Sequence, residues 1–171
     1  WEMRQRAIVL DTISHSTAIS ACQRCRQWET ASEMLEYMQQ TSIKANAVTY
    51  GATISASKTC SRWPGALWLL AEMRLGGIAW NTITCSAAIT ACEKGHEWQL
   101  ALILLIDMRW SMISPDTIAF NSAISACEKG QQWQHALGML TNSLPSFSII
   151  PDKITFSAAI SACEKGQQWQ G

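Results

Sequence analysis

The chain has 171 residues, of which 48% are hydrophobic and only 15% are charged, with thirteen basic residues balancing thirteen acidic ones. A typical soluble domain has about 25% charged residues, so the composition favours apolar packing and the net charge gives no argument for a nucleic-acid partner. The longest strongly apolar run, Leu100 to Ile106, is far shorter than the ~20 residues that span a bilayer, which argues against a membrane segment.

One helical phrase recurs five times. Its clearest copy runs from Asp116 to Trp133, and the tryptophan that closes each copy recurs after 35, 35, 35 and 36 residues, at Trp28, Trp63, Trp98, Trp133 and Trp169. A fixed period of about 20 to 50 residues marks a solenoid, in which each unit buries its apolar face by stacking on its neighbours. We therefore expect an all-α fold, a right-handed superhelix of helix-turn-helix repeats.

The phrase divides the chain into segments that we number as repeats. Residues 1–11 resemble the end of a preceding repeat and are followed by repeat 1 at 12–46, repeat 2 at 47–81, repeat 3 at 82–116, repeat 4 at 117–152 and a truncated repeat 5 at 153–171. Because the chain begins at Trp1 and stops within a repeat, we expect it to be a piece of a longer protein whose targeting segment lies elsewhere.

The first helix of each repeat is expected to bury a stripe of residues at i, i+4 and i+7. In repeat 4 the stripe is Phe120, Ile124 and Cys127, and the matching sets are His15, Ile19 and Cys22; Tyr50, Ile54 and Ser57; Cys85, Ile89 and Cys92; and Phe156, Ile160 and Cys163. A turn follows whose glycine is expected in a left-handed helix cap. This glycine is Gly95, Gly130 or Gly166.

The second helix is predicted to start near the tryptophan. Its buried face in repeat 2 reads Ala66, Leu69, Leu70 and Met73. In repeat 4, Asn142, Ser143 and Pro145 interrupt this pattern and one extra residue precedes Asp152, so we expect a shortened helix and a longer loop there. The repeats end in a residue that can cap the next helix: Asn46, Asn81, Asp116 or Asp152.

The seven cysteines do not predict a metal site. Four of them share one slot of the repeat, which indicates packing: Cys22, Cys92, Cys127 and Cys163. Cys25 and Cys60 replace the turn glycine, and the C-x-x-C spacing of Cys22 and Cys25 has no second pair beside it. We predict no metal, no cofactor and a reducing compartment.

The repeat resembles the pentatricopeptide repeat family. The resemblance rests on the 35-residue unit of two antiparallel helices and on its closing pattern, Ile-x-Pro-Asp leading into Thr-Ile-x-Phe-Asn-x-x-Ile, and it covers nearly the whole chain. Tetratricopeptide repeats, the nearest rival, usually have about 34 residues and carry their tryptophan early in the first helix. Here the tryptophan opens the second helix.

The resemblance implies single-stranded RNA binding, with one base per repeat read by two or three side chains. The base-reading pairs it implies are Ser16 with Asn46, Gly51 with Asn81, Ser86 with Asp116, and Asn121 with Asp152, while Ser157 lacks its partner. An aliphatic residue three positions before each reader would sandwich the base: Ile13, Val48, Ile83, Ile118 and Ile154. The family's preferences then imply the RNA sequence 5'-A-N-G-U-3', and a role in RNA processing, editing, stability or translation in a chloroplast or mitochondrion.

Helical spacing alone supports the same face. Ile118, Asn121 and Ser125 lie at i, i+3 and i+7, away from the buried stripe, and the hydroxyl recurs at Ser20, Ser55, Thr90 and Ser161. Beyond it a cation recurs that suits a phosphate backbone: Arg24, Lys58, Lys94, Lys129 and Lys165. The alternative is that these are solvated helix ends whose lysines complement the helix dipole and pair with Glu93, Glu128 or Glu164.

A protein- or peptide-binding scaffold without RNA binding is the alternative function. The neutral net charge, Gly51 at a reading slot, and Trp80 and Trp110, both expected to be exposed, favour it. His15, His96 and His135 occupy different slots, so no catalytic constellation recurs and we expect no enzymatic activity. Single-stranded RNA is the expected partner, joined by other proteins of an RNA-processing complex, with no membrane partner.

Overall fold

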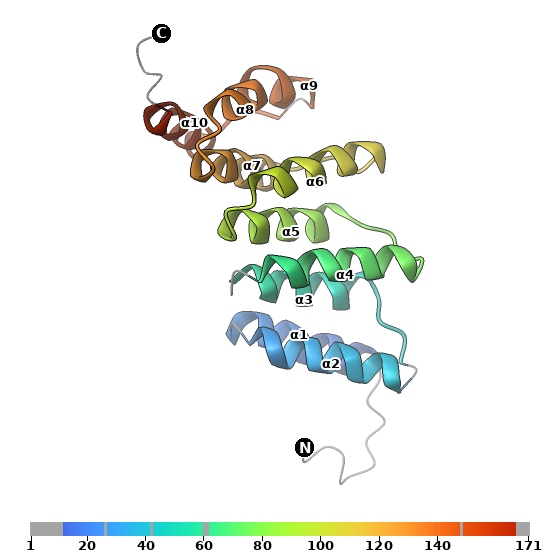
Figure 1. The fold of residues 1–171 in the computed structure, drawn as a ribbon. Helices are drawn as coiled ribbons and strands as arrows, with labels where there is room; N and C mark the ends of the chain where they lie inside the picture. The colour runs from blue at the N-terminus through green and yellow to red at the C-terminus, as the bar shows by residue number, and fades with distance from the viewer. Residues whose placement is uncertain (1–11, 26, 42, 60–61, 148, 167–171) are drawn as a thin grey trace.

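The computed structural model describes residues 12–25, 27–41, 43–59, 62–147 and 149–166. Within these ranges all regular structure is helical (Figure 1), and no helix is long and apolar enough to cross a bilayer. The first helices of the repeats are α1 (Thr12–Cys25), α3 (Ala47–Thr59), α5 (Thr82–Lys94), α7 (Thr117–Lys129) and α10 (Lys153–Lys165). The second helices are α2 (Trp28–Gln40), α4 (Trp63–Leu75), α6 (Trp98–Trp110) and a composite of α8 (Trp133–Gly138), the π-helical turn η2 (Met139–Ser143) and α9 (Leu144–Ser146).

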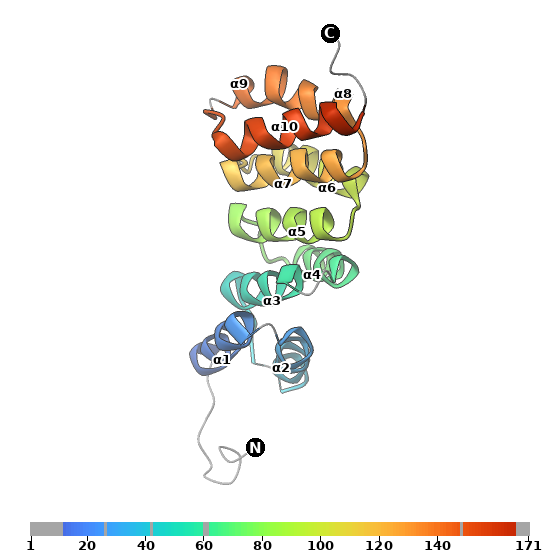
Figure 2. The same cartoon turned by 90° about the vertical axis from the view of Figure 1, so that its left-hand side faces the viewer.

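The first helices stack in one column, which Figure 2 shows from α1 at one end to α10 at the other. Each contacts the first helix of the next repeat, and each second helix packs against its own first helix and against the first helix of the following repeat. The predicted all-α solenoid is therefore confirmed. The predicted end of a preceding repeat, in 1–11, and the last residues of repeat 5, in 167–171, lie outside the described residues.

The predicted apolar stripe forms the core in the first four repeats but not in the fifth. Ile54, Ile89 and Ile124 are completely buried. In repeat 5, where the prediction is wrong, Phe156 is 49% and Ile160 67% exposed. The described residues contain no second helix after α10, so this face lacks the partner that α8 provides for α7.

The turn glycines do not take the left-handed conformation predicted for them. Gly95 and Gly130 both have φ of −81°, and the left-handed residue is the next one, His96 at 63° or Gln131 at 57°. The glycine is needed for space, because a Cβ on Gly130 would lie 2.3 Å from Cδ1 of Trp98 in the preceding repeat. Equivalent contacts join Gly95 to Trp63 and Gly166 to Trp133. The turn glycine of each of these repeats thus packs directly against the tryptophan of the preceding repeat.

The second helix of repeat 4 is not shortened, contrary to prediction. Helical backbone continues from Trp133 to Ser146, and α8, η2 and α9 together contain one residue more than the 13 of α6. A π turn widens a helix to take in an extra residue, so η2 absorbs the insertion. Pro145 is the second residue of α9, the short segment that follows η2.

Candidate functional site

Exposed aliphatic residues recur at one position of all five first helices. Each is the second residue of its helix and is between 62% and 73% exposed: Ile13, Val48, Ile83, Ile118 and Ile154. Leaving such a side chain in water forgoes about 1.5–3 kcal/mol of burial. Five equivalent exposures along one column therefore mark a surface that is suited to an apolar, flat ligand group.

The residue that ends each repeat caps the following first helix, as predicted. Asn81 and Asp152 form capping boxes, in which the cap oxygen accepts from the backbone N–H of Thr84 or Thr155 and the threonine hydroxyl accepts from the backbone N–H of the cap. The same backbone hydrogen bond is accepted by Asn46 and Asp116. The hydrogen bonds to the start of the helix therefore fix the orientation of these side chains for any further role.

In repeats 3 and 4 the residues paired for base reading are in direct contact. Ser86 donates to Oδ1 of Asp116 at 2.9 Å, and the amide of Asn121 donates to both carboxylate oxygens of Asp152 at 3.1 and 3.2 Å. The Thr155 hydroxyl bonds to Oδ1 of Asn121 at 2.5 Å, which turns the Asn121 NH₂ group toward Asp152. Hydrogen bonds, first from the backbone N–H and then from the hydroxyl of Thr155, lower the pKa of Asp152, so it is a carboxylate at neutral pH.

In repeats 1 and 2 the corresponding pairs are not joined. The Ser16 hydroxyl shares a 2.9 Å hydrogen bond with Thr49 and donates to a backbone carbonyl of its own helix at 2.7 Å. Gly51 offers no polar side-chain group, and a Cβ there would lie 3.5 Å from Cγ2 of Thr84, an ordinary contact distance. Ser157 of repeat 5 is exposed.

Sequence reasoning missed the threonine three residues after the cap. Thr49, Thr84 and Thr155 are completely buried, and each hydroxyl accepts from the backbone N–H of its cap. The recurring capping-box spacing is the signal that identifies them. In repeat 4 the slot holds Ala119, so Asp116 has no threonine hydroxyl beside it and its side chain accepts from Ser86 instead.

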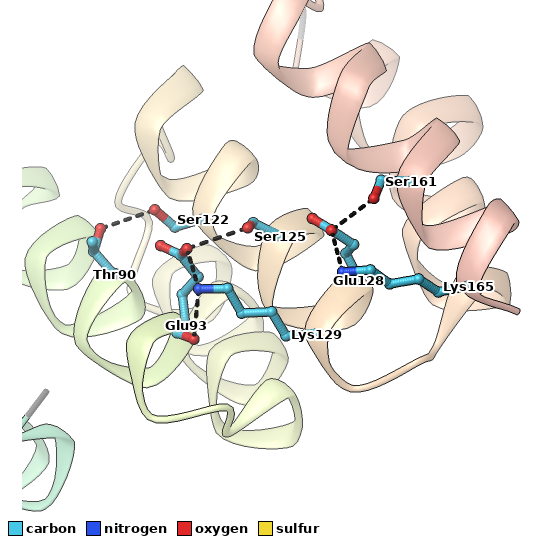
Figure 3. Close-up of polar contacts among 8 residues, drawn as sticks. All are labelled: Thr90, Glu93, Ser122, Ser125, Glu128, Lys129, Ser161 and Lys165. Carbon is cyan, nitrogen blue, oxygen red and sulfur yellow. Dashed lines mark hydrogen bonds and ion pairs between the residues drawn. The ribbon is translucent and has the colours of Figure 1, made fainter.

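A second polar network crosses the boundaries between repeats near the ends of the first helices (Figure 3). Lys129 of repeat 4 donates to Oε1 of Glu93 in repeat 3 at 2.9 Å, and Ser125 donates to the same oxygen at 3.2 Å. One repeat later, bonds of 2.8 Å join Lys165 and Ser161 to Glu128. We call these two sites the rungs. The lysines do pair with glutamate, but across a repeat boundary rather than within one helix end.

The rung at Glu128 holds an ionised carboxylate beneath a partly exposed cation. Burial opposes ionisation of Glu128, but hydrogen bonds from Lys165 and Ser161, with the charges of Lys165 and Lys129, outweigh it and lower the pKa of Glu128. The glutamate side chains are both 17% exposed, and the lysines 30% and 50%. The Glu128 rung is therefore close to neutral in charge at neutral pH.

The first three repeats have no rung between them because other residues fill the glutamate slot. Gln23 in repeat 1 and Lys58 in repeat 2 stand where the later repeats have glutamate. Arg24, Lys58 and Lys94 consequently form no ion pair within the described residues. The five cations predicted to meet phosphate thus divide into three free and two paired.

The sequence matches the model of a known family of helical repeats. The model of the pentatricopeptide repeat domain fits residues 1–58 and 68–129, more than half of the chain. The chain belongs to the pentatricopeptide repeat family. Among curated proteins none matches its sequence.

Solved structures of pentatricopeptide repeat (PPR) proteins share the fold. PPR10 in complex with an 18-nt psaJ RNA element has a TM-score of 0.77 and 22% identity, over 91% of this chain and 22% of that one. PPR10 from maize has a TM-score of 0.61 and 14% identity, over 99% and 34%. The PPR domain of Arabidopsis thaliana protein-only RNase P 1 in complex with tRNA has a TM-score of 0.76 and 10% identity, over 89% and 83%. The chain thus spans about a fifth of the PPR10 chain in the RNA complex.

Four cysteines of this PPR chain are buried packing residues: Cys22, Cys85, Cys92 and Cys127. Burial raises the pKa of Cys85 to about 11 and that of Cys92 and Cys127 to about 12, so these thiols are protonated at neutral pH. In the part of the chain that the structure describes, no three His, Cys, Asp or Glu residues come together to hold a metal ion.

The two tryptophans predicted to be exposed behave differently. Trp110 is 81% exposed, as predicted. Trp80 is half-buried, its indole N–H donates to the Leu70 carbonyl at 2.8 Å, and the Arg74 guanidinium lies 5.8 Å from its ring centre. The prediction is therefore wrong for Trp80, because the loop before α5 folds its ring back onto the preceding helix.

Proposed function

We propose that the column of first helices binds single-stranded RNA, one base per repeat. The row of five exposed aliphatic residues carries the proposal, because a base offers the flat apolar face that such side chains can cover. The reader residues follow three positions later, where they would meet the base edge. Two PPR structures of the same fold contain RNA, which supports the assignment.

Each reader pair presents a different set of hydrogen-bonding groups. By the family preferences, Ser16 with Asn46 would select adenine, Ser86 with Asp116 guanine, and Asn121 with Asp152 uracil, giving 5'-A-N-G-U-3'. One net hydrogen bond contributes only about 0.5–1.5 kcal/mol, so we expect a weak, short footprint. By family resemblance, we also propose that the chain acts on RNA in a chloroplast or mitochondrion.

The substitution Asn121→Ser tests the code without disturbing a helix cap, since Asp152 keeps its bonds to the backbone of α10. It recreates the Ser–Asp pair of repeat 3, so preference at the fourth base should move from uracil toward guanine. Binding to four RNAs that differ only at that base measures the change. Identical rankings in the variant and the parent chain would leave Asp152 with its capping role alone.

The alternative, a protein-binding scaffold, is favoured by a different surface. Trp68 on α4 and Ile103, Ile106 and Trp110 on α6 are between 51% and 81% exposed on the second helices. Aromatic anchors of this kind are typical of protein interfaces. Failure of the chain to bind any single-stranded RNA pool at low salt would favour this function over RNA binding.

A further inference from the structure

We propose that Glu93 and Glu128 are built-in counter-ions that withhold Lys129 and Lys165 from RNA phosphate, so that phosphate contact is confined to the first three repeats. This inference rests on the proposed function, because it concerns cations assigned to the RNA backbone. It goes beyond that function because it divides the repeated cations into those that contact RNA phosphate and those that are neutralised by a glutamate.

The geometry of the rungs carries the inference. In each rung a lysine ammonium and a serine hydroxyl converge on one carboxylate oxygen, at 2.9 and 3.2 Å on Glu93 and at 2.8 Å each on Glu128 (Figure 3). An ammonium beside a hydroxyl is also a donor set that binds a phosphate oxygen. The anion position that RNA would use is already filled by the neighbouring repeat.

Charge balance gives the consequence for RNA binding. Free cations on a protein displace the counter-ions condensed on a nucleic acid, and this release makes binding salt-dependent, by about 0.7 units of slope per contact with a single strand. A lysine that is already neutralised must first leave its glutamate, so it adds little to the release. Among the described residues, Lys94 has no such partner. The position in repeat 2 that corresponds to Glu93 holds Lys58, which cannot neutralise it.

A purely structural role for the rungs makes a different prediction. If Glu93 and Glu128 only bind adjacent first helices together, their loss should lower the melting temperature and weaken RNA binding at every salt concentration, without changing the salt slope. The salt slope therefore separates the two roles.

The first experiment replaces both rung glutamates, Glu93→Gln with Glu128→Gln, in the full chain. Binding to an oligonucleotide that contains 5'-A-N-G-U-3' is measured at salt concentrations from about 50 to about 300 mM, where counter-ion release makes binding depend on salt. We expect the slope to steepen by about 1 to 1.5 and the affinity at low salt to rise about five- to tenfold. Glu164→Gln is the control, because it removes a glutamate from the same slot without freeing either rung lysine.

The second experiment builds a rung where none exists, and it stands if the first variant fails to fold. Lys58→Glu would give Lys94 the partner that Lys129 has, whereas Lys58→Gln removes only the charge of Lys58. We expect Lys58→Gln to lower the slope by about 0.7 and Lys58→Glu by about 1.4.

An unchanged slope in the Glu93/Glu128 double variant, or equal slopes for Lys58→Glu and Lys58→Gln, would overturn the inference while leaving RNA binding intact. An equal gain in slope and affinity for Glu164→Gln would also overturn it, by reducing the effect to net charge. If neither the parent chain nor any variant binds RNA, the proposed function fails and the inference fails with it.

Discussion

The first and last parts of the stack use the same slots in opposite ways. In repeats 1 and 2 the reader pairs are not joined, and the cations Arg24 and Lys58 have no ion-pair partner in the described structure. In repeats 3 and 4 the reader pairs are hydrogen-bonded to each other, and from Lys129 onward the cations are paired. The residue type at a slot therefore does not decide whether its polar group is available to a ligand. The side chain that packs beside it in the folded stack does.

The largest expected effect comes from removing the free cations. Arg24→Ala, Lys58→Ala and Lys94→Ala together should lower the salt slope of RNA binding by about 2, at ~0.7 per contact. Lys129→Ala with Lys165→Ala should lower it by less than ~0.7, because these lysines are already neutralised. Filter binding over a salt series measures both. If both sets of substitutions lower the salt slope equally, the free and the paired cations do not differ in their contribution to RNA binding.

A smaller effect is expected at the junctions between repeats. In the last part, Gly130→Ala would place a Cβ 2.3 Å from Cδ1 at the base of the Trp98 ring, whereas in the first part Gly65→Ala would meet the far edge of the Trp28 ring at 2.6 Å. The far edge can move aside more easily. Gly130→Ala should therefore destabilise the fold by about 1–3 kcal/mol, and Gly65→Ala by less.

Urea unfolding of both variants at matched protein concentration measures this difference. Gly138→Ala is the control, since nothing lies within 4 Å of a Cβ there. It should be neutral or stabilise the fold by up to about 1 kcal/mol. A greater loss for Gly65→Ala than for Gly130→Ala would show that the first junction is the tighter one.

The smallest expected effect is a gain of base preference in repeat 2. Gly51→Ser fits at an ordinary 3.5 Å contact and would create a Ser–Asn pair with Asn81, as in repeat 1. Adenine should then be favoured at the second base by about 0.5–1.5 kcal/mol, as measured in competition between four RNAs. Gly51→Ala, which adds the Cβ without the hydroxyl, should leave that base unread. If both variants prefer adenine equally, the hydroxyl is not the reader.

What the sequence predicted well depends on spacing within one repeat. The stripe of Ile54, Ile89 and Ile124 and the caps at Asn81 and Asp152 follow from helical periodicity and local hydrogen bonding, which a short window contains. These elements are confirmed.

What it could not predict depends on contacts between repeats. Lys129 bonds to a glutamate 36 residues earlier, and Gly130 fits against a tryptophan 32 positions earlier, so neither partner lies in the same helix. The left-handed residue shifts to Gln131 for the same reason, because the glycine is used for space. Exposure of Phe156 likewise depends on whether a neighbouring helix is present.

The π turn in the second helix of repeat 4 keeps the column of first helices in register although this repeat is one residue longer. Although the spacing to the next tryptophan grows from 35 to 36, η2 takes up the added residue before Asp152, which still caps α10 and still meets Asn121. A change in the length of a second helix therefore does not shift the first helix of the next repeat. Repeats of unequal length can therefore stack without shifting the first residues of their first helices out of register.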